Sequence, residues 1–272
     1  MVSNNRRPLG VRVVVALACE AAPIVARYRM RRMATESPLS IYGDADQLHY
    51  LVVSGIGYHA ATMATAYLAG VSGACKSTAW LNVGIAGGSP GYPLGSLWLA
   101  NKIVDTHRPN RFYPALLPDH GASTTVVTVD QVEDKPGSGT LVDMEAAGFY
   151  RTASGLATHE TVQCLKVVSD HGMDATSKIS KAKVQSLIEA QMTGIGITID
   201  SLLDQSNTLA TRWADPPYFA ALSSEQHYTV SQAQQLRLLL QRWHILLPHE
   251  DVLSFLNGQT TVLTGLTKHL DA

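Results

Sequence analysis

Residues 79–88 read Ala-Trp-Leu-Asn-Val-Gly-Ile-Ala-Gly-Gly, a nearly continuous apolar run that ends in small residues. This pattern predicts a strand over 79–84 that is covered on both faces, followed by a loop whose backbone can approach a ligand closely. We expect further strands at 12–18, 49–54, 96–105, 124–130 and 162–169, and helices at 20–32, 59–69, 144–154 and 177–203. Strands that alternate with helices indicate an α/β protein.

The chain has 272 residues, of which 46% are hydrophobic and 16% are charged. This length and composition are typical of one large globular domain with an appended segment. We place the catalytic domain at 11–205. The following segment, 206–272, is rich in Gln and Leu, and we interpret it as a helical extension with helices at 231–243 and 249–256.

The charge balance and the cysteines exclude several classes of function. With 21 Lys and Arg against 22 Asp and Glu, the chain has no electrostatic basis for binding nucleic acid. No apolar run approaches the roughly 20 residues that would cross a bilayer, so we expect no membrane partner. Three cysteines without a C-x-x-C pair favour free thiols in the cytoplasm, and no group of residues has metal-ligand spacing. We therefore expect no metal and no cofactor.

A glycine-rich element, Ser-Gly-Ile-Gly-Tyr-His-Ala, occupies residues 54–60. It matches the G-x-G-x-x-A form of the dinucleotide fingerprint, which also needs an acidic residue at the end of the next strand. That strand ends in Asn82-Val83-Gly84 without an acid. The element therefore does not predict a nicotinamide cofactor.

Acidic residues occur at two predicted strand ends. Val142-Asp143-Met144-Glu145-Ala146 begins a predicted helix, and Lys166-Val167-Val168-Ser169-Asp170 ends a strand. Taken singly, either could be helix capping or favourable charge at a helix N-terminus. Ligands of open α/β sheets bind at the carboxyl ends of strands, so both are also candidate site residues.

In chain order, Ala16-Leu17-x-x-Glu20, Ser54-Gly55-Ile56-Gly57, Gly84-x-Ala86-Gly87-Gly88, Asp143-Met144-Glu145-Ala146 and Val168-Ser169-Asp170 resemble the nucleoside phosphorylase family. Within it, the likeness is greatest to the methylthioadenosine/S-adenosylhomocysteine nucleosidases. The resemblance implies a three-layer α/β/α sandwich around a mixed, partly barrel-like sheet, assembled as a homo-oligomer. It also implies cleavage of the N-ribosidic bond of a purine nucleoside.

The resemblance assigns roles residue by residue. Asp170 would protonate the leaving purine and Ser169 would orient Asp170, while Glu145 would grip the ribose hydroxyls above Met144. Glu20 would deprotonate the attacking water. The remaining positions that would contact substrate are Asp143, Ile85, Ala86, Gly87 and Val132. Two of these depart from the family, which has Ser or Thr at the place of Ile85 and a base-stacking aromatic residue near Val132.

Three functions stay open from the sequence. Hydrolysis is favoured because the carboxylate of Glu20 would repel a phosphate dianion. A phosphate-dependent phosphorylase, which is a glycosyltransferase, would instead use Arg108 and Arg111 from the long loop at 106–123. The third is a non-catalytic nucleoside-binding protein, which the substitutions at Ile85 and Val132 favour. The sequence leaves the base and the 5′ substituent undetermined.

Overall fold

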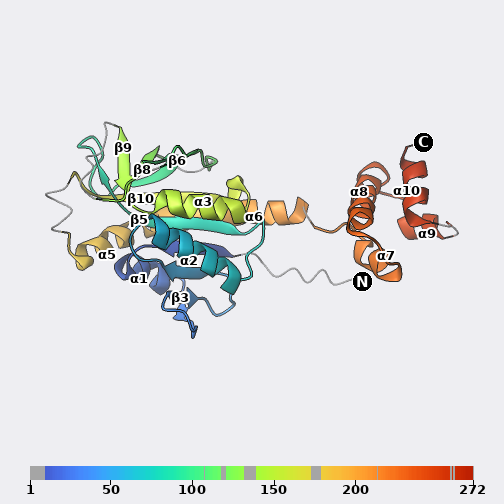
Figure 1. Ribbon diagram of the computed structural model, residues 1–272, viewed down its shortest axis with the longest axis horizontal. Helices are drawn as coiled ribbons and strands as arrows, with labels where there is room; N and C mark the ends of the chain where they lie inside the picture. The colour runs from blue at the N-terminus through green and yellow to red at the C-terminus, as the bar shows by residue number, and fades with distance from the viewer. Residues whose placement is uncertain are drawn as a thin grey trace. The chain divides into compact units, whose positions relative to one another are not determined.

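The computed structural model describes residues 10–106, 108–117, 121–131, 139–172, 179–212, 214–257, 259 and 261–271. The chain divides into two compact units, Met1–Ala210 and Thr211–Ala272. The first contains the sheet and the second is helical (Figure 1). Each unit is described by itself.

The described strands of the first unit form one mixed sheet. They are β1 (Val11–Val15), β2 (Arg31–Arg32), β3 (Ser40–Gly43), β4 (Tyr50–Val53), β5 (Ala79–Gly88), β6 (Leu97–Asp105), β7 (Arg111–Phe112), β8 (Ser123–Thr128), β9 (Thr140–Asp143) and β10 (Val162–Asp170). Their order is β10-β6-β8-β9-β5-β1-β4-β3-β2, with β7 beside β6. Because β10 also pairs with β5, the five strands β5, β10, β6, β8 and β9 close into a barrel.

Strands β4, β1, β5 and β10 run parallel to one another at the centre of the sheet. Strand β1 is buried along its whole length, and its side chains alternate between two apolar cores. Val14 belongs to one core and Val13 to the other. This explains why the strand is apolar at every position except Arg12, since a strand covered on both faces needs no polar side.

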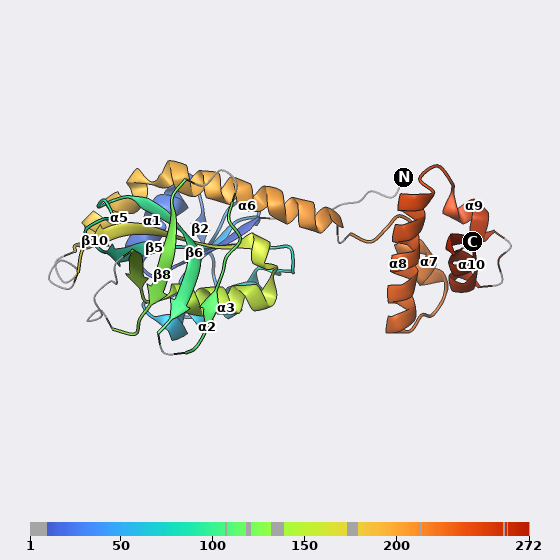
Figure 2. The same ribbon diagram turned by 90° about the horizontal axis from the view of Figure 1, so that it is seen from above.

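Helices cover both faces of the sheet and complete three layers (Figure 2). One face packs against α2 (Tyr58–Val71) and α3 (Ala146–Leu156) through residues such as Leu68 and Phe149. The other packs against α1 (Ala18–Arg27), α5 (Lys181–Ala190) and α6 (Met192–Arg212), through residues such as Ile24 and Ile188. A short 3-10 helix, His159–Thr161, precedes β10. The three-layer fold with a partly closed mixed sheet that the sequence predicted is confirmed.

Several element boundaries differ from the sequence prediction. The first helix ends at Arg27 rather than at 32, because Arg29 adopts a left-handed conformation with φ 50°. The expected helix over 177–203 is instead two helices, α5 and α6, with Gln191 ending the first. Strands β2, β3, β7 and β9 were not predicted, because they are at most four residues long and too short to show a period.

The second unit consists of α7 (Phe219–Glu225), α8 (Val230–Leu246), α9 (Val252–Leu256) and α10 (Val262–Leu270). Its core joins side chains of all four helices, among them Phe219, Trp243, Val252 and Leu266. Thr229 caps α8 through a reciprocal capping box with Gln232, so the helix begins at Val230, one residue before the predicted start at 231. Helices α7 and α10 were missed.

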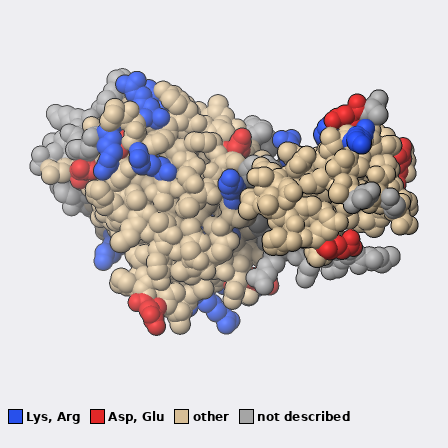
Figure 3. Space-filling model, turned by 45° about the vertical axis from the view of Figure 1, so that its right-hand side comes forward, with Lys and Arg blue, Asp and Glu red and all other residues tan. Residues whose placement is uncertain are grey.

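Uncharged residues cover most of the face shown in Figure 3, where basic and acidic side chains both occur in small groups. The described residues on this side form no continuous basic stripe of the kind that tracks a nucleic-acid backbone. Among the described helices, none is long and apolar enough to cross a membrane.

Candidate active site

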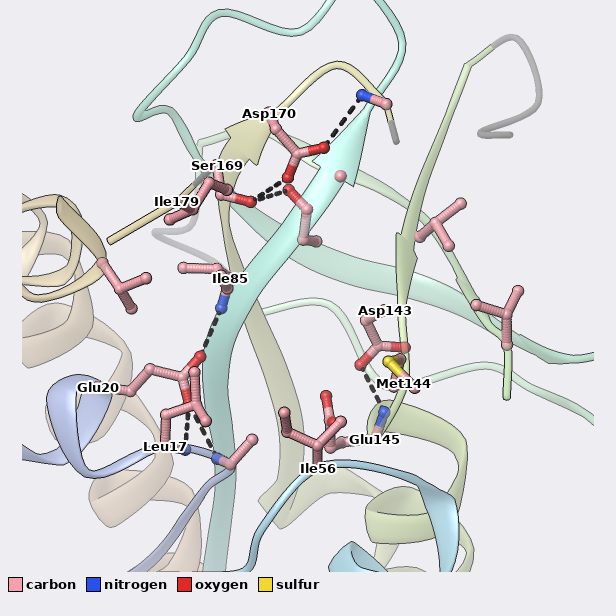
Figure 4. Close-up of a pocket in the computed structure, with 17 residues that line it drawn as sticks. Leu17, Glu20, Ile56, Ile85, Asp143, Met144, Glu145, Ser169, Asp170 and Ile179 are labelled. Carbon is pink, nitrogen blue, oxygen red and sulfur yellow. Dashed lines mark hydrogen bonds between the residues drawn. The ribbon is translucent and has the colours of Figure 1, made fainter. Parts of the chain in front are cut away.

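A pocket of about 270 Å³ opens where β1, β5, β9 and β10 end (Figure 4). Its walls come from segments far apart in the chain, which the sheet brings together at one edge. The described lining residues are Ala16, Leu17, Glu20, Ile56, Ile85, Ala86, Gly87, Val129, Val142, Asp143, Met144, Glu145, Ser169, Asp170, Gly172, Ile179 and Val184. Apart from its acids and Ser169, the side chains of this lining are apolar.

Glu20 lies in the first turn of α1 and is buried. Its Oε2 accepts hydrogen bonds from the backbone N–H groups of Ala16 and Leu17, each at 2.9 Å. Its Oε1 accepts from the N–H of Ile85, also at 2.9 Å. Burial raises the pKa of Glu20, while these backbone donors and the charge of Lys166 oppose the rise. The result is a rigidly held carboxyl group with increased proton affinity.

Asp143 ends β9 and holds the start of α3. Its Oδ2 accepts from the N–H groups of Glu145 (3.2 Å) and Ala146 (2.7 Å), and its Oδ1 accepts from Thr128 Oγ1 (2.7 Å). The same Oδ2 lies 2.7 Å from Nζ of Lys166 on β10. Asp143 lines the pocket, but its oxygens are thus engaged by the protein.

Lys166 is fully buried and pairs with Asp143. Burial alone would lower the pKa of Lys166, but the charges of Asp143 and Glu145 outweigh burial and raise it. The lysine is therefore a permanent positive charge behind the pocket. A Cβ on Gly84 would lie 3.4 Å from Lys166 Nζ and 3.1 Å from Glu20 Oε1, so a larger residue at this point of β5 would crowd the carboxyl group of Glu20.

Glu145 precedes the first turn of α3 and is also buried. Its Oε1 accepts from the N–H of Gly57 at 2.8 Å. Gly57 has φ 105°, a conformation that other residues rarely adopt, which explains the second glycine of the 54–60 element. Burial, followed by the charge of Asp143, raises the pKa of Glu145 to about 7, although Lys166 and the Gly57 N–H oppose the rise.

Asp170 ends β10 opposite Gly87, directly after a bulge in the β5–β10 pairing. A bulge turns the following side chain away from the regular alternation, and Asp170 lines the pocket. Its Oδ2 accepts from Ser169 Oγ at 2.6 Å, and its Oδ1 accepts from Gly172 N at 3.0 Å. Ser169 Oγ also lies 3.2 Å from the carbonyl oxygen of Ala86, so its single proton has two acceptors.

The pocket contains most of the residues that the sequence predicted for the site. Glu20, Glu145 and Asp170 line it together, as do Asp143, Met144, Ser169, Ile85, Ala86 and Gly87. Val132 lies outside the described residues. Figure 4 shows Asp170 near the tip of the strand that carries Ile85 and Glu20 further down beside the same strand, with Glu145 and Met144 across the pocket.

The two arginines predicted as phosphate ligands do not belong to the described lining. Arg108 lies 3.4 Å from Asp105 Oδ2, and its guanidinium stacks over the ring of Tyr58 at 4.2 Å. Arg111 is exposed on β7. Within the described part of the lining there is no Lys or Arg side chain.

Sequence reasoning missed two features of the site. Lys166 was quoted only as part of a strand, although a lysine inside an otherwise apolar run is a signal that it pairs with a buried acid. The apolar residues Leu17, Ile56, Ile179 and Val184 also line the pocket. Of these, Leu17 and Ile56 belong to the sequence motifs at 16–20 and 54–57, but nothing about an apolar side chain there indicates a role in the site.

The described residues contain no group of three or more His, Cys, Asp or Glu side chains placed to hold a metal ion. The pocket holds four carboxyl groups, of which that of Asp143 is paired with the single buried lysine, Lys166. Such a site favours a ligand on which positive charge develops and disfavours anions.

No family model matches the chain, and neither does any curated protein. Solved structures do match. A methylthioadenosine nucleosidase from Arabidopsis thaliana has 19% identity and a TM-score of 0.61, covering 74% of this chain and all of that one. A Helicobacter pylori nucleosidase mutant with 5′-methylthioadenosine in its active site has 12% identity and a TM-score of 0.57, covering 71% and 98%.

Futalosine hydrolase of H. pylori has 14% identity and a TM-score of 0.53, covering 74% of this chain and 98% of that one. At sequence identities this low, the comparisons show a similar fold and nothing more. The chain therefore has a fold similar to that of methylthioadenosine nucleosidases and futalosine hydrolase.

Proposed function

We propose that the chain hydrolyses the N-ribosidic bond of a purine nucleoside, releasing free base and a ribose moiety. One observation carries the proposal: Glu20, Glu145 and Asp170 come from three distant segments and line the same pocket. Helix capping can explain the position of any one of these acids, but it does not explain why all three line the same pocket. A nucleosidase needs three such groups, one at the leaving base, one at the ribose and one at the attacking water.

Asp170 acts at the base. The C1′–N9 bond breaks with its electron pair passing to the purine, and Asp170 supplies a proton to N7. Ser169 supports the carboxyl group of Asp170 in both of its protonation states. The Ser169 hydroxyl donates to Asp170 Oδ2 when that carboxyl group is ionised. It donates to the Ala86 carbonyl oxygen, and accepts from Asp170, when the carboxyl is protonated.

Glu145 acts at the sugar. As the bond breaks, positive charge develops on the ribose ring, and an ionised carboxylate at the ribose hydroxyls stabilises that charge more in the transition state than in the substrate. The pKa of about 7 means that Glu145 is about half ionised at neutral pH. Activity is therefore expected to rise as pH increases through this range.

Glu20 acts on water. A water molecule attacks C1′ and loses its proton to Glu20, whose pKa is raised by burial and which is therefore a stronger base than an exposed carboxylate. The three backbone hydrogen bonds to Glu20 hold it in place, which reduces the entropic cost of positioning the water.

The charge of the pocket favours hydrolysis over phosphorolysis. A phosphate dianion needs positive charge or several N–H donors, whereas the described lining offers four carboxyl groups and no Lys or Arg side chain. Arg108 is already engaged by Asp105 and Tyr58. The same reasoning disfavours nucleotides with a 5′-phosphate, and the apolar surface of Leu17, Ile56 and Ile179 favours an uncharged 5′ substituent.

The proposal is tested by chromatography of free base after the protein is incubated with methylthioadenosine, S-adenosylhomocysteine, adenosine, inosine or guanosine, each with and without phosphate. We expect base release that does not depend on phosphate. Release that requires phosphate contradicts the role of Glu20 and supports a phosphorylase. Tight binding without release from any compound supports the non-catalytic nucleoside-binding protein instead.

A further inference from the structure

Helix α8 of the second unit carries a stripe of residues, all exposed except the half-buried Gln241, on the side that faces away from its own unit. The helix packs against its unit through Leu236, Leu239, Leu240 and Trp243. The opposite side of the helix carries Val230, Gln234, Leu238, Gln241 and Ile245, which follow one another at intervals of three or four residues. These five residues are called the α8 stripe. Intervals of this kind keep side chains on one face of a helix.

The apolar members of the α8 stripe are among the most exposed large hydrophobic residues described. The exposed fraction is 86% for Val230, 56% for Leu238 and 75% for Ile245. Single exposed apolar residues are ordinary, but an aligned row of them along several helical turns is typical of a contact surface.

The α8 stripe is symmetric along the helix. Val230 and Ile245 lie equally far from the midpoint between Arg237 and Leu238, and so do Gln234 and Gln241. If a second α8 runs antiparallel across this midpoint, each Val230 meets an Ile245, each Gln234 meets a Gln241, and the two Leu238 side chains lie together at the centre. A surface that is complementary to itself under a two-fold rotation is the requirement for a symmetric dimer.

The charges beside the α8 stripe are already neutralised within the unit. Arg237 Nε lies 2.6 Å from Asp215 Oδ1, and Arg242 Nη2 lies 3.1 Å from Asp271 Oδ1. Two copies can therefore approach without repulsion between unpaired like charges. A charged partner, by contrast, finds no unpaired countercharge among these residues. The complementary surface is uncharged, apolar and amide-bearing, which describes the stripe itself.

We propose that the α8 stripe is a homodimer interface, in which two copies of the chain pair their α8 helices antiparallel around Leu238. This inference is independent of the proposed reaction, because it uses no residue of the pocket.

The first test is sedimentation equilibrium of the full chain from micromolar to hundreds of micromolar concentrations. We expect concentration-dependent association, and we expect Leu238→Glu with Ile245→Glu to weaken it at least about tenfold, because each dimer would bury unpaired charge. The matched control is Leu246→Glu, since Leu246 is on the same helix and 57% exposed but lies off the stripe. It should leave association unchanged.

A second pair of variants tests the orientation. Antiparallel pairing places residue 234 against residue 241 of the other copy, so Gln234→Glu with Gln241→Lys should retain association, while Gln234→Lys with Gln241→Lys should lose it. Circular dichroism checks that every variant stays folded.

Several results overturn the proposal. They are a wild type that stays monomeric throughout, an unchanged assembly size in the Leu238→Glu, Ile245→Glu variant, and equal weakening by Leu246→Glu. Loss of association in both charge-pattern variants overturns the antiparallel arrangement.

Discussion

Replacing Glu145 with Gln is expected to abolish most activity and at the same time stabilise the first unit at neutral pH. The folded state raises the pKa of Glu145 from its ordinary 4.5 to about 7, because the carboxyl is buried beside Asp143. Ionising it in the folded state is therefore costly, and glutamine removes that cost. Glutamine keeps an oxygen that can accept the hydrogen bond from Gly57 N.

The effect of Glu145 on the free energy of unfolding depends on pH, because its pKa differs between the folded and the unfolded chain. Below pH 4.5, Glu145 is protonated in both the folded and the unfolded chain, so its titration does not affect stability. As pH rises from 4.5 to about 7, the unfolded chain loses this proton first, and the free energy of unfolding falls. A shift from 4.5 to about 7 corresponds to about 3 kcal/mol, at about 1.4 kcal/mol per pKa unit.

The assay is urea unfolding of wild type and Glu145→Gln at a series of pH values between 4 and 8. Hydrogen exchange of peptides from β5 reports the first unit separately from the second. The stability advantage of Glu145→Gln should grow by about 3 kcal/mol across this range. Glu160→Gln, at an exposed glutamate, is the control and should show no such growth. An advantage that is independent of pH, or that shrinks as pH rises, refutes the reasoning.

Other changes in the pocket have equally definite outcomes. Lys166→Met should move the rising limb of the pH–activity profile to higher pH by about one to three units, because Lys166 lowers the pKa of Glu145 and of Glu20. The control is Thr128→Val, which removes a neutral donor to Asp143 and should leave that limb in place. Gly84→Ala should reduce kcat by displacing Glu20. Gly70→Ala should not, because a Cβ added at Gly70 would meet no atom within 4 Å. Equal rates of base release by the two variants contradict the close packing at Gly84. A 5′-phosphate on an accepted nucleoside should reduce kcat/KM at least about tenfold by repulsion from the carboxylates, and equal rates for the two compounds contradict the electrostatic account.

The sequence predicted the central strands because burial on both faces leaves a visible signature. Strand β1 is apolar at every position except Arg12, and its residues alternate between two cores. The short strands β3 and β9 left no such signature. Strand β9 has only four residues, and its place in the barrel depends on pairing not only with the preceding strand β8 but also with β5, which is distant in the chain.

The candidate site was predictable where chemistry and position coincide. Glu20, Glu145 and Asp170 follow strands or begin helices, and a resemblance in motif order connected them. The contacts that set the pKa values and positions of these three acids were not predictable from the sequence. The proximity of Lys166 to Asp143 depends on the spatial relation of β10 to β9, and the support of Glu145 by Gly57 joins residues 88 positions apart.

The measurement that tests the central claim most directly compares wild type with Asp170→Asn for both nucleoside binding and base release, without phosphate. The account predicts that binding of an accepted nucleoside stays within about tenfold while base release falls by about 10²–10⁴-fold, since Asn cannot supply a proton to the leaving purine. Asp200→Asn, at an exposed aspartate on α6, should match wild type in both. Base release by Asp170→Asn at the wild-type rate would contradict the account.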